Sequence, residues 1–255
     1  MRKITINLAA VAAFCIVVAS PALVSSSCAT PKTEQEDTTI IREDSGITAL
    51  KYSSPEVPAS IECCGKTIDL SRFDRHERMD RELLAFTYMH STSLQMLKKA
   101  NRYFPIVEPI LKENGIPDDF KYLMVIESNM NPTARSSAGA AGLWQFMQGT
   151  GRDYGLEVNN NVDERYHIEK ATRAACRYLK DAYAKYKDWV AVAASYNAGQ
   201  ARIASQLAKQ DVDDSLDLQL VEETERNKYR ILAAKQIFNA PTTKRYSQRS
   251  SEIKP

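Results

Sequence analysis

Residues 117–127 read PDDFKYLMVIE, and the fold can be worked out from this stretch. A proline followed by two acids predicts the start of a helix, because proline suits the first turn and negative charge suits the positive helix end. Within such a helix, positions 120, 123, 124 and 127 share one face. That face is apolar except for Glu127. The stretch therefore predicts a helix that carries one carboxyl group toward the core or a cleft.

Glu127 has two interpretations on spacing alone. A glutamate is almost never fully buried without a partner, and burial raises the pKa of its carboxyl group. The negative C-terminal end of the helix acts in the same direction. A carboxylic acid that stays protonated near neutral pH is what a general acid for glycoside cleavage requires. The alternative is a structural glutamate that accepts hydrogen bonds from neighbouring backbone amides.

Helical periodicity continues on both sides of this stretch. Further helices are expected over residues 75–100, 107–112, 169–186 and 189–196, after residue 200, and over residues 223–238. A break is expected at residues 103–105, which read YFP. Strand-like sequence is confined to residues 61–70, so the sequence predicts a mostly α fold with a short β-like N-terminal segment.

Two further motifs follow Glu127, of which the first is rich in glycine and aromatic residues and the second carries polar side chains. Residues 138–147 read AGAAGLWQFM, in which glycines allow close approach of the backbone to a ligand and aromatic rings offer flat faces to sugars. Such an aromatic cluster can equally be a packed core. Residues 195–199 read SYNAG and place two polar side chains at a helix end that Gly199 terminates.

Three motifs now stand in order: Glu127-Ser128, residues 142–147 (GLWQFM) and residues 195–199 (SYNAG). Together they resemble the motifs of lytic transglycosylases that carry the soluble-transglycosylase, goose-lysozyme-like domain. The resemblance is strong over residues 103–207 and loose over residues 56–240. It implies a lysozyme-like fold for the helical part of the chain.

The resemblance implies cleavage of the β-1,4 bond between N-acetylmuramic acid and N-acetylglucosamine in peptidoglycan. Glu127 would protonate the glycosidic oxygen and then, as a carboxylate, deprotonate the muramoyl 6-hydroxyl, which closes a 1,6-anhydro ring without water. The acetamido group of the substrate would assist. No second carboxyl is placed as Glu127 is, which fits this single-acid scheme better than a pair of carboxylates. The enzyme class is a lyase that acts on a polysaccharide, with no cofactor and no metal.

The other site residues also come from the resemblance. Tyr196 matches the family tyrosine that hydrogen-bonds the catalytic acid. The expected substrate-binding residues are Ser137, Gly139, Gln145, Met147, Tyr196, Asn197 and Glu223.

One family motif is altered in this chain. The late Glu-Thr-x-x-Tyr motif appears at residues 223–227 as ETERN, with Asn227 in the place of the tyrosine and Tyr229 two residues on as a candidate replacement. This departure weakens the case for Glu223 as a cleft contact. Two alternatives stay open: a muramidase that hydrolyses the same bond and, in view of the change at Asn227, a non-catalytic protein that binds peptidoglycan.

The N-terminal residues predict export. Arg2 and Lys3 precede an apolar run and a small-x-small cleavage pattern, so residues 1–22 are expected to be a signal peptide that leads to the periplasm. The alternative is an uncleaved membrane anchor. A lipoprotein signal would instead extend to residue 27, with a lipid anchor at Cys28 in the outer membrane, although Ser25 stands where an aliphatic residue is usual. The remaining expected segments are 23–58 (disordered linker), 59–102 (strand and helix extension), 103–240 (transglycosylase domain) and 241–255 (polar tail).

Charge and cysteine content narrow the partners. The 255-residue chain has a net charge of +2, and loss of residues 1–22 brings it to zero, so no nucleic-acid partner is expected. Glycan strands are the expected partner, with the protein a monomer. Cys63, Cys64 and Cys176 do not have the spacing of a zinc site. A disulfide from Cys63 or Cys64 to Cys176 and three buried thiols are both compatible with the sequence.

Overall fold

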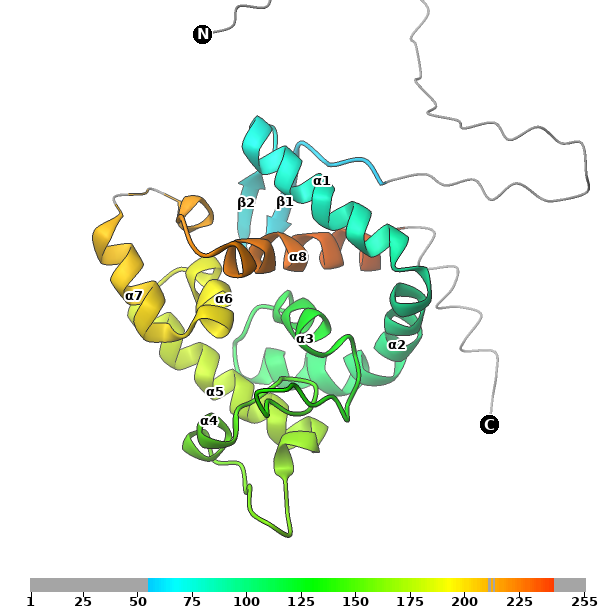
Figure 1. Cartoon of the computed structure of the whole chain (residues 1–255), viewed down its shortest axis with the longest axis vertical. Helices are drawn as coiled ribbons and strands as arrows, with labels where there is room; N and C mark the ends of the chain where they lie inside the picture. The colour runs from blue at the N-terminus through cyan, green and yellow to red at the C-terminus, as the bar shows by residue number, and fades with distance from the viewer. Residues whose placement is uncertain (1–54, 211, 213, 241–255) are drawn as a thin grey trace, which may run out of the picture. The chain divides into compact units, whose positions relative to one another are not determined.

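The computed structural model describes residues 55–240 apart from 211 and 213, and its course is shown in Figure 1. The elements in chain order are β1 (Ser60–Cys63), β2 (Lys66–Asp69), α1 (Phe73–Tyr88), α2 (His90–Glu113), α3 (Phe120–Ser128), α4 (Gln148–Asp153), η1 (Glu164–Tyr166), α5 (Ile168–Tyr186), α6 (Trp189–Ala198), α7 (Gln200–Lys209), η2 (Ser215–Asp217) and α8 (Glu222–Asn239). The expected fold class, mostly α with a short N-terminal β segment, is confirmed. The expected signal peptide, the Cys28 anchor, the polar tail and nearly all of the linker lie outside the described residues.

The two strands form an antiparallel hairpin in which Cys63 pairs with Lys66. The two turn residues between them, Cys64 and Gly65, have φ angles of 54° and 77°. Positive φ at both central positions is the backbone geometry that joins tightly paired antiparallel strands. Ile61 and Ile68 point inward and pack with side chains from α1 and α8.

Helix α2 corrects the sequence prediction of a break at residues 103–105. It continues through Pro105 and Pro109 to Glu113. A proline inside a helix removes one hydrogen bond and costs about 3 kcal/mol. The helix is nevertheless retained because a whole apolar face of it is buried, and each large side chain on that face contributes about 2 kcal/mol by burial. The buried apolar residues of α2 are Met96, Ala100, Tyr103, Val107, Ile110 and Leu111.

Helix α3 lies in the middle of the described domain, where it contacts α2 and α8 (Figure 1). Its start agrees with the prediction from the PDD sequence, with Asp119 at the N-terminal boundary. Phe120, Leu123 and Met124 are buried on the face that the periodicity indicated. This face anchors the helix, so the position of Glu127 near its C-terminal end is fixed by core packing.

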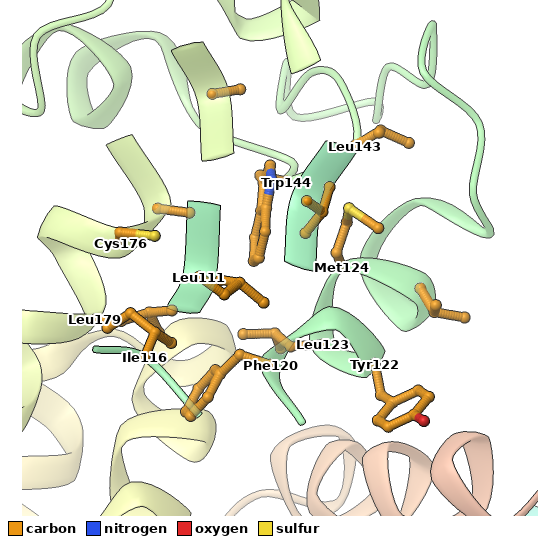
Figure 2. Close-up of a cluster of buried hydrophobic side chains, with 14 of the residues drawn as sticks. Leu111, Ile116, Phe120, Tyr122, Leu123, Met124, Leu143, Trp144, Cys176 and Leu179 are labelled. Atoms are coloured by element: carbon orange, nitrogen blue, oxygen red, sulfur yellow. The ribbon is translucent and has the colours of Figure 1, made fainter. Parts of the chain in front are cut away.

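The aromatic motif of residues 142–147 belongs to the same core. Figure 2 shows Trp144 among Leu111, Leu123 and Leu143. Trp144 has no exposed surface and its Nε1 donates a hydrogen bond of 2.9 Å to Thr172 Oγ1 on α5. Phe146 is also buried. The two rings are therefore packed against protein, as the core alternative predicted, and do not face a ligand.

Helices α5, α6 and α7 pack on one another and on α2 and α8. Helix α5 packs on α2 and α6, while α6 also contacts α7 and α8. Gly199, with a φ of 86°, separates α6 from α7, as the sequence indicated. Within residues 55–240, no helix has the length and apolar character needed to span a membrane.

An ionic cluster joins α1 to α8. The side chain of Glu82 on α1 is 1% exposed, and its carboxylate accepts hydrogen bonds from three arginines. Arg226 Nε lies 2.8 Å from Oε1, Arg230 Nε lies 3.3 Å from Oε2, and Arg81 Nε lies 3.1 Å from Oε1. This cluster fixes α8 against α1 and therefore sets how α8 faces α3.

Candidate active site

Glu127 occupies the last turn of α3, which ends at Asn129 in the left-handed region with a φ of 49°. The side chain of Glu127 is mostly shielded from solvent. Its Oε1 atom is buried and has no hydrogen-bond partner among the described residues. A buried polar atom without a partner costs about 1–3 kcal/mol, so such an atom usually serves a function.

The surroundings of Glu127 raise the pKa of its carboxyl group to about 7. Loss of solvent is the largest cause. Hydrogen bonding by Asn227 lowers the pKa, the negative charge of Glu223 raises it, and the positive charge of Arg230 lowers it. The carboxyl group is therefore poised to give and to take a proton near neutral pH.

The loop that follows α3 is held by Arg165 from η1. The guanidinium is buried, and its Nη1 donates hydrogen bonds to the carbonyl oxygens of Gly139 (2.8 Å) and Phe146 (2.9 Å). Asp163 binds the other side of the same guanidinium. Gly142 is required here, because a Cβ atom at this position would lie 1.9 Å from the carbonyl oxygen of Arg165. Arg165 is a positioning residue that orders this loop.

Gln145 is at a turn of the same loop, with a φ of 49°. Its Nε2 donates hydrogen bonds to the carbonyl oxygens of Gly142 (2.8 Å) and Ala134 (3.3 Å). These bonds fix the amide plane in a half-buried position beside the cleft. The structure therefore brings Gln145 to the same cleft as Glu127, as the sequence motif indicated.

The cleft has a volume of about 430 Å³. Its walls come from α2, the end of α3 and the following loop. Residues that line it are Thr92, Gln95, Lys99, Glu127, Ser128, Asn129, Asn131, Ala134, Arg135, Ser136 and Gln145. All of these except Ala134 are polar, which suits a ligand rich in hydroxyl and amide groups.

The α2 wall was missed by the sequence analysis. Thr92, Gln95 and Lys99 are spaced three and four residues apart, so they share one face of α2. This polar stripe within an otherwise amphipathic segment was the available signal. Lys99 and Arg135 form no salt bridge within the part of the chain that the structure describes, and they leave two positive charges at the cleft.

Tyr196 lies behind Glu127 in an aromatic cluster. Its ring centroid is 5.1 Å from that of Tyr178 and 6.4 Å from that of Trp144. Burial and the nearby negative charge of Glu127 raise the pKa of its hydroxyl well above the ordinary value. The hydroxyl donates a hydrogen bond of 2.8 Å to the carbonyl oxygen of Trp144. The expected hydrogen bond to the catalytic acid is thus replaced by one to the backbone, and the role of Tyr196 at the site stays a prediction.

Helix α8 forms a further side of the site. Asn227 is buried and supplies the hydrogen bond to the Glu127 side chain, from the position where the family motif has tyrosine. Glu223 is exposed one turn earlier. Thr224 Oγ1 and Asn197 Oδ1 are 2.9 Å apart, which connects α8 to the end of α6.

Tyr229 does not replace the missing tyrosine. Residues two apart on a helix point to different sides, so Tyr229 cannot share the direction of Asn227. Its side chain is buried in a second core cluster that includes Ile61, Met79 and Leu83. Asn227 is therefore the residue that faces Glu127.

The remaining predicted site residues lie around the loop. Ser137 is exposed next to the cleft residue Ser136, and Gly139 offers its carbonyl oxygen to Arg165. Met147 is 45% exposed just before α4. None of these three lines the cleft itself, and their contact with a ligand stays a prediction.

Comparison with known proteins finds similarity over the part of the chain that contains this site. Residues 105–217 match the family model described as transglycosylase SLT domain. The chain is 30% identical over 178 residues to membrane-bound lytic murein transglycosylase D of Escherichia coli (strain K12). This match covers 68% of the present chain and 38% of the relative, so the chain spans less than half the length of that relative.

Two more distant matches have related descriptions. The peptidoglycan transglycosylase gp16 of Escherichia phage T7 is 33% identical over 95 residues, which is 36% of this chain and 7% of the phage protein. The solved structure of an inactive mutant of lytic transglycosylase Slt from Pseudomonas aeruginosa is 21% identical, with a TM-score of 0.45. That alignment covers 60% of this chain and 25% of the Slt chain.

Proposed function

We propose that the chain is a lytic transglycosylase of peptidoglycan, on the premise that residues 105–217 match the transglycosylase SLT domain model. The proposed reaction cleaves the β-1,4 bond between N-acetylmuramic acid and N-acetylglucosamine. The observation that carries the proposal is the carboxyl group of Glu127, which is buried without a partner at Oε1 and lies at a polar cleft.

In the first step Glu127 acts as the general acid. With a pKa of about 7, its carboxyl group is largely protonated at mildly acidic pH and about half protonated at neutral pH. It gives this proton to the glycosidic oxygen as the bond to the muramoyl anomeric carbon breaks. The departing sugar leaves as a neutral alcohol, and the acetamido group of the substrate stabilises the positive charge that develops at the anomeric carbon.

In the second step the same group acts as the base. The Glu127 carboxylate takes the proton of the muramoyl 6-hydroxyl, whose oxygen attacks the anomeric carbon and closes a 1,6-anhydro ring. Glu127 is thereby returned to its protonated state, so the cycle needs neither water nor a second carboxylate. The Asn227 hydrogen bond supports this exchange because it moderates the pKa of Glu127.

Side chains in the walls of the cleft bind the glycan. Gln145 is held in one orientation by two backbone hydrogen bonds, which allows it to orient an acetamido or hydroxyl group. Lys99 on α2 and Arg135 on the loop after α3 both line the cleft, and their positive charges suit the carboxylates of peptide stems. We assign substrate contacts also to Ser137, Gly139, Met147, Asn197 and Glu223.

A hydrolytic reaction on the same bond is the second candidate. Its supporting observation is Glu223, whose negative charge acts on Glu127 and which therefore provides a second carboxylate near the acid. Hydrolysis with two carboxylates uses one as acid and the other to activate water or form an intermediate. In that case Glu223→Gln would abolish activity as fully as Glu127→Gln.

Mass spectrometry of the fragments released from purified sacculi tests the proposal. The expected products end in 1,6-anhydromuramic acid, and Glu127→Gln releases none of them. Reducing-end muramic acid would establish the hydrolytic reaction instead. Equal clearing of a sacculus suspension by the wild type and Glu127→Gln would remove Glu127 from the mechanism, and binding without any release would establish a non-catalytic wall-binding protein.

We further propose export to the periplasm by the signal at residues 1–22, with residues 23–58 as a linker, 59–102 as an extension, 103–240 as the catalytic domain and 241–255 as a tail. If the signal is instead of the lipoprotein type and extends to residue 27, a lipid at Cys28 would anchor the protein to the outer membrane. The protein would act as a monomer on glycan strands. Labelling of cells with a radioactive fatty acid, for the wild type and Cys28→Ala, tests the anchor.

A further inference from the structure

Two adjacent thiols meet at the hairpin turn, on a side of the domain that the proposed reaction does not use. Cys63 ends β1 with a buried side chain, and Cys64 follows it in the left-handed region with a φ of 54°. Their Sγ atoms are 3.7 Å apart, and no disulfide links them. The turn thus presents two free sulfurs side by side.

A carboxylate from a distant part of the sequence faces these sulfurs. Asp119 Oδ2 accepts a hydrogen bond of 2.6 Å from the backbone N–H of Cys64. Its Oδ1 lies 2.6 Å from Lys235 Nζ on α8. The two sulfurs and a carboxylate oxygen of Asp119 all lie within 4.8 Å of one another. Sulfur and carboxylate oxygen are both ordinary ligands of zinc.

The spacing of the sulfurs matches that of a tetrahedral zinc site. Two thiolates that each lie about 2.3 Å from a tetrahedral zinc are about 3.8 Å apart. The Sγ atoms of Cys63 and Cys64 need almost no movement to reach this separation. We propose that Cys63, Cys64 and Asp119 form a zinc-binding site that joins the hairpin to the start of α3.

The charges of the cluster balance with a divalent ion. Binding releases one proton from each thiol, which leaves two thiolates, one carboxylate and the Lys235 ammonium around a 2+ ion. The sum is zero, so no charge is buried uncompensated. Each carboxylate oxygen has two lone pairs, so Asp119 can keep its bonds to Lys235 and to the Cys64 amide while it binds the metal.

A water molecule can complete the coordination. A cavity of about 30 Å³ borders Cys63, Cys64 and Asp119, and its other walls include Phe120 and Trp189. This volume holds about one water molecule, which needs polar partners in so apolar a place. A bound zinc ion and the Asp119 carboxylate would provide them. Three protein ligands and one water are a common coordination for zinc.

The spacing of the three ligands in the sequence does not indicate this site. The cysteine pair lacks the CxxC pattern, and the third ligand lies 55 residues further on. Only the packing of the hairpin against the beginning of α3 brings the three together. The proposal therefore replaces the expectation, drawn from the spacing, that the chain binds no metal.

The test uses the reduced full chain, freed of metal, and zinc in competition with a chromophoric chelator. We expect one zinc per chain and the release of two protons. Cobalt in place of zinc should show the near-ultraviolet charge-transfer absorption of thiolate ligands. Cys64→Ser is expected to weaken binding more than about 100-fold, and Asp119→Asn at least about 10-fold. Zinc should raise the Tm of the wild type but not that of Cys64→Ser.

Cys176→Ser is the matched control, because Cys176 is a buried free thiol on α5 outside the cluster. It should bind zinc as the wild type does. Since Cys63 is buried and its substitution can disturb folding, Cys64→Ser, which alters a half-buried side chain, decides the test. Absence of zinc binding at micromolar concentration, equal binding by Cys64→Ser, or a Cys63–Cys64 disulfide in peptide maps of the native protein would overturn the proposal.

Discussion

Two glutamates of this domain differ in the partners of their carboxyl groups, and this difference distinguishes a structural glutamate from a candidate catalytic one. Glu82 on α1 and Glu127 on α3 both have carboxylate oxygens withdrawn from solvent. Glu82 is bound by three arginines, whereas Oε1 of Glu127 has no hydrogen-bond partner among the described residues. Burial of a carboxyl group without a paired cation favours the neutral acid.

Helix α8 supplies the partners of both groups. Arg226 and Arg230 bind Glu82, while Asn227 hydrogen-bonds Glu127 from the same turns of the helix. A single helix therefore gives salt bridges to one carboxylate and a neutral amide to the other, on which Arg230 acts by its charge without a salt bridge. The comparison teaches that the choice of partner on α8, rather than burial alone, makes Glu127 a candidate acid.

Replacement by glutamine should have its most different effects at Glu127 and Glu82 when enzymatic activity is measured. Glu127→Gln removes the proton donor, so release of products from sacculi is expected to fall by at least about 1,000-fold, in proportion to general acid catalysis. Glu82→Gln should keep activity within about tenfold at a temperature where it is folded. The rates of release at equal protein concentration check this. A similar loss in both variants would contradict the distinction.

Substitution by glutamine should change the free energy of unfolding in opposite directions at the two sites. At Glu127 the effect depends on pH. Its pKa is raised from 4.5 to about 7, so the folded protein binds more protons than the unfolded chain between these values. Stability of the wild type is then lost as the pH rises from 4.5 to 7, by at most about 3 kcal/mol.

Glu127→Gln lacks this loss, and its free energy of unfolding should exceed that of the wild type more at pH 8 than at pH 4.5. Urea denaturation at the two pH values measures the difference. Parallel changes in the two proteins would show that the carboxyl group of Glu127 is not shifted by folding.

Glu82→Gln should instead destabilise the protein by about 2 kcal/mol at neutral pH. It leaves three guanidinium groups without their carboxylate, and the partial exposure of those groups keeps the cost below that of a fully buried pair. Urea denaturation at pH 7 checks the sign. A more stable Glu82→Gln variant would mean that the cluster does not hold α8 against α1.

The smallest effect concerns the pH profile of activity. Asn227→Leu removes a hydrogen bond that lowers the pKa of Glu127, and Glu223→Gln removes a charge that raises it. The alkaline limb of kcat/KM should therefore move to higher pH in Asn227→Leu and to lower pH in Glu223→Gln, each by about one pH unit or less. Shifts in the same direction would rule out Asn227 and Glu223 as opposing influences.

The helical parts of the fold were predictable because their periodicity is local. The helix that contains Glu127 and the helices after residue 168 begin and end close to the expected residues, whereas the helix expected over residues 75–100 is divided at Met89 into α1 and α2. The break expected at residues 103–105 was wrong, because burial of the inner face of α2 outweighs the cost of Pro105, and this burial depends on contacts distant in sequence.

The site was predictable only in part. The periodicity placed Glu127 on a buried face, and the aromatic motif led to Gln145. The α2 wall, the clamp by Arg165 and the contact of Asn227 with Glu127 depend on how separate helices pack, which one sequence does not show. The arginine cluster at Glu82 was not predicted for the same reason, since Arg226 and Arg230 lie 144 and 148 residues further along the chain than Glu82.

The most direct test of the comparison is a titration of the Glu127 carboxyl group itself. Carbon-13 NMR of protein labelled at the glutamate side-chain carboxyl carbon, with Glu127→Gln to assign the resonance, follows its protonation. The account predicts a midpoint near pH 7. A midpoint near 4.5, the ordinary value, would contradict it, because Glu127 would then be ionised at neutral pH as a structural carboxylate is.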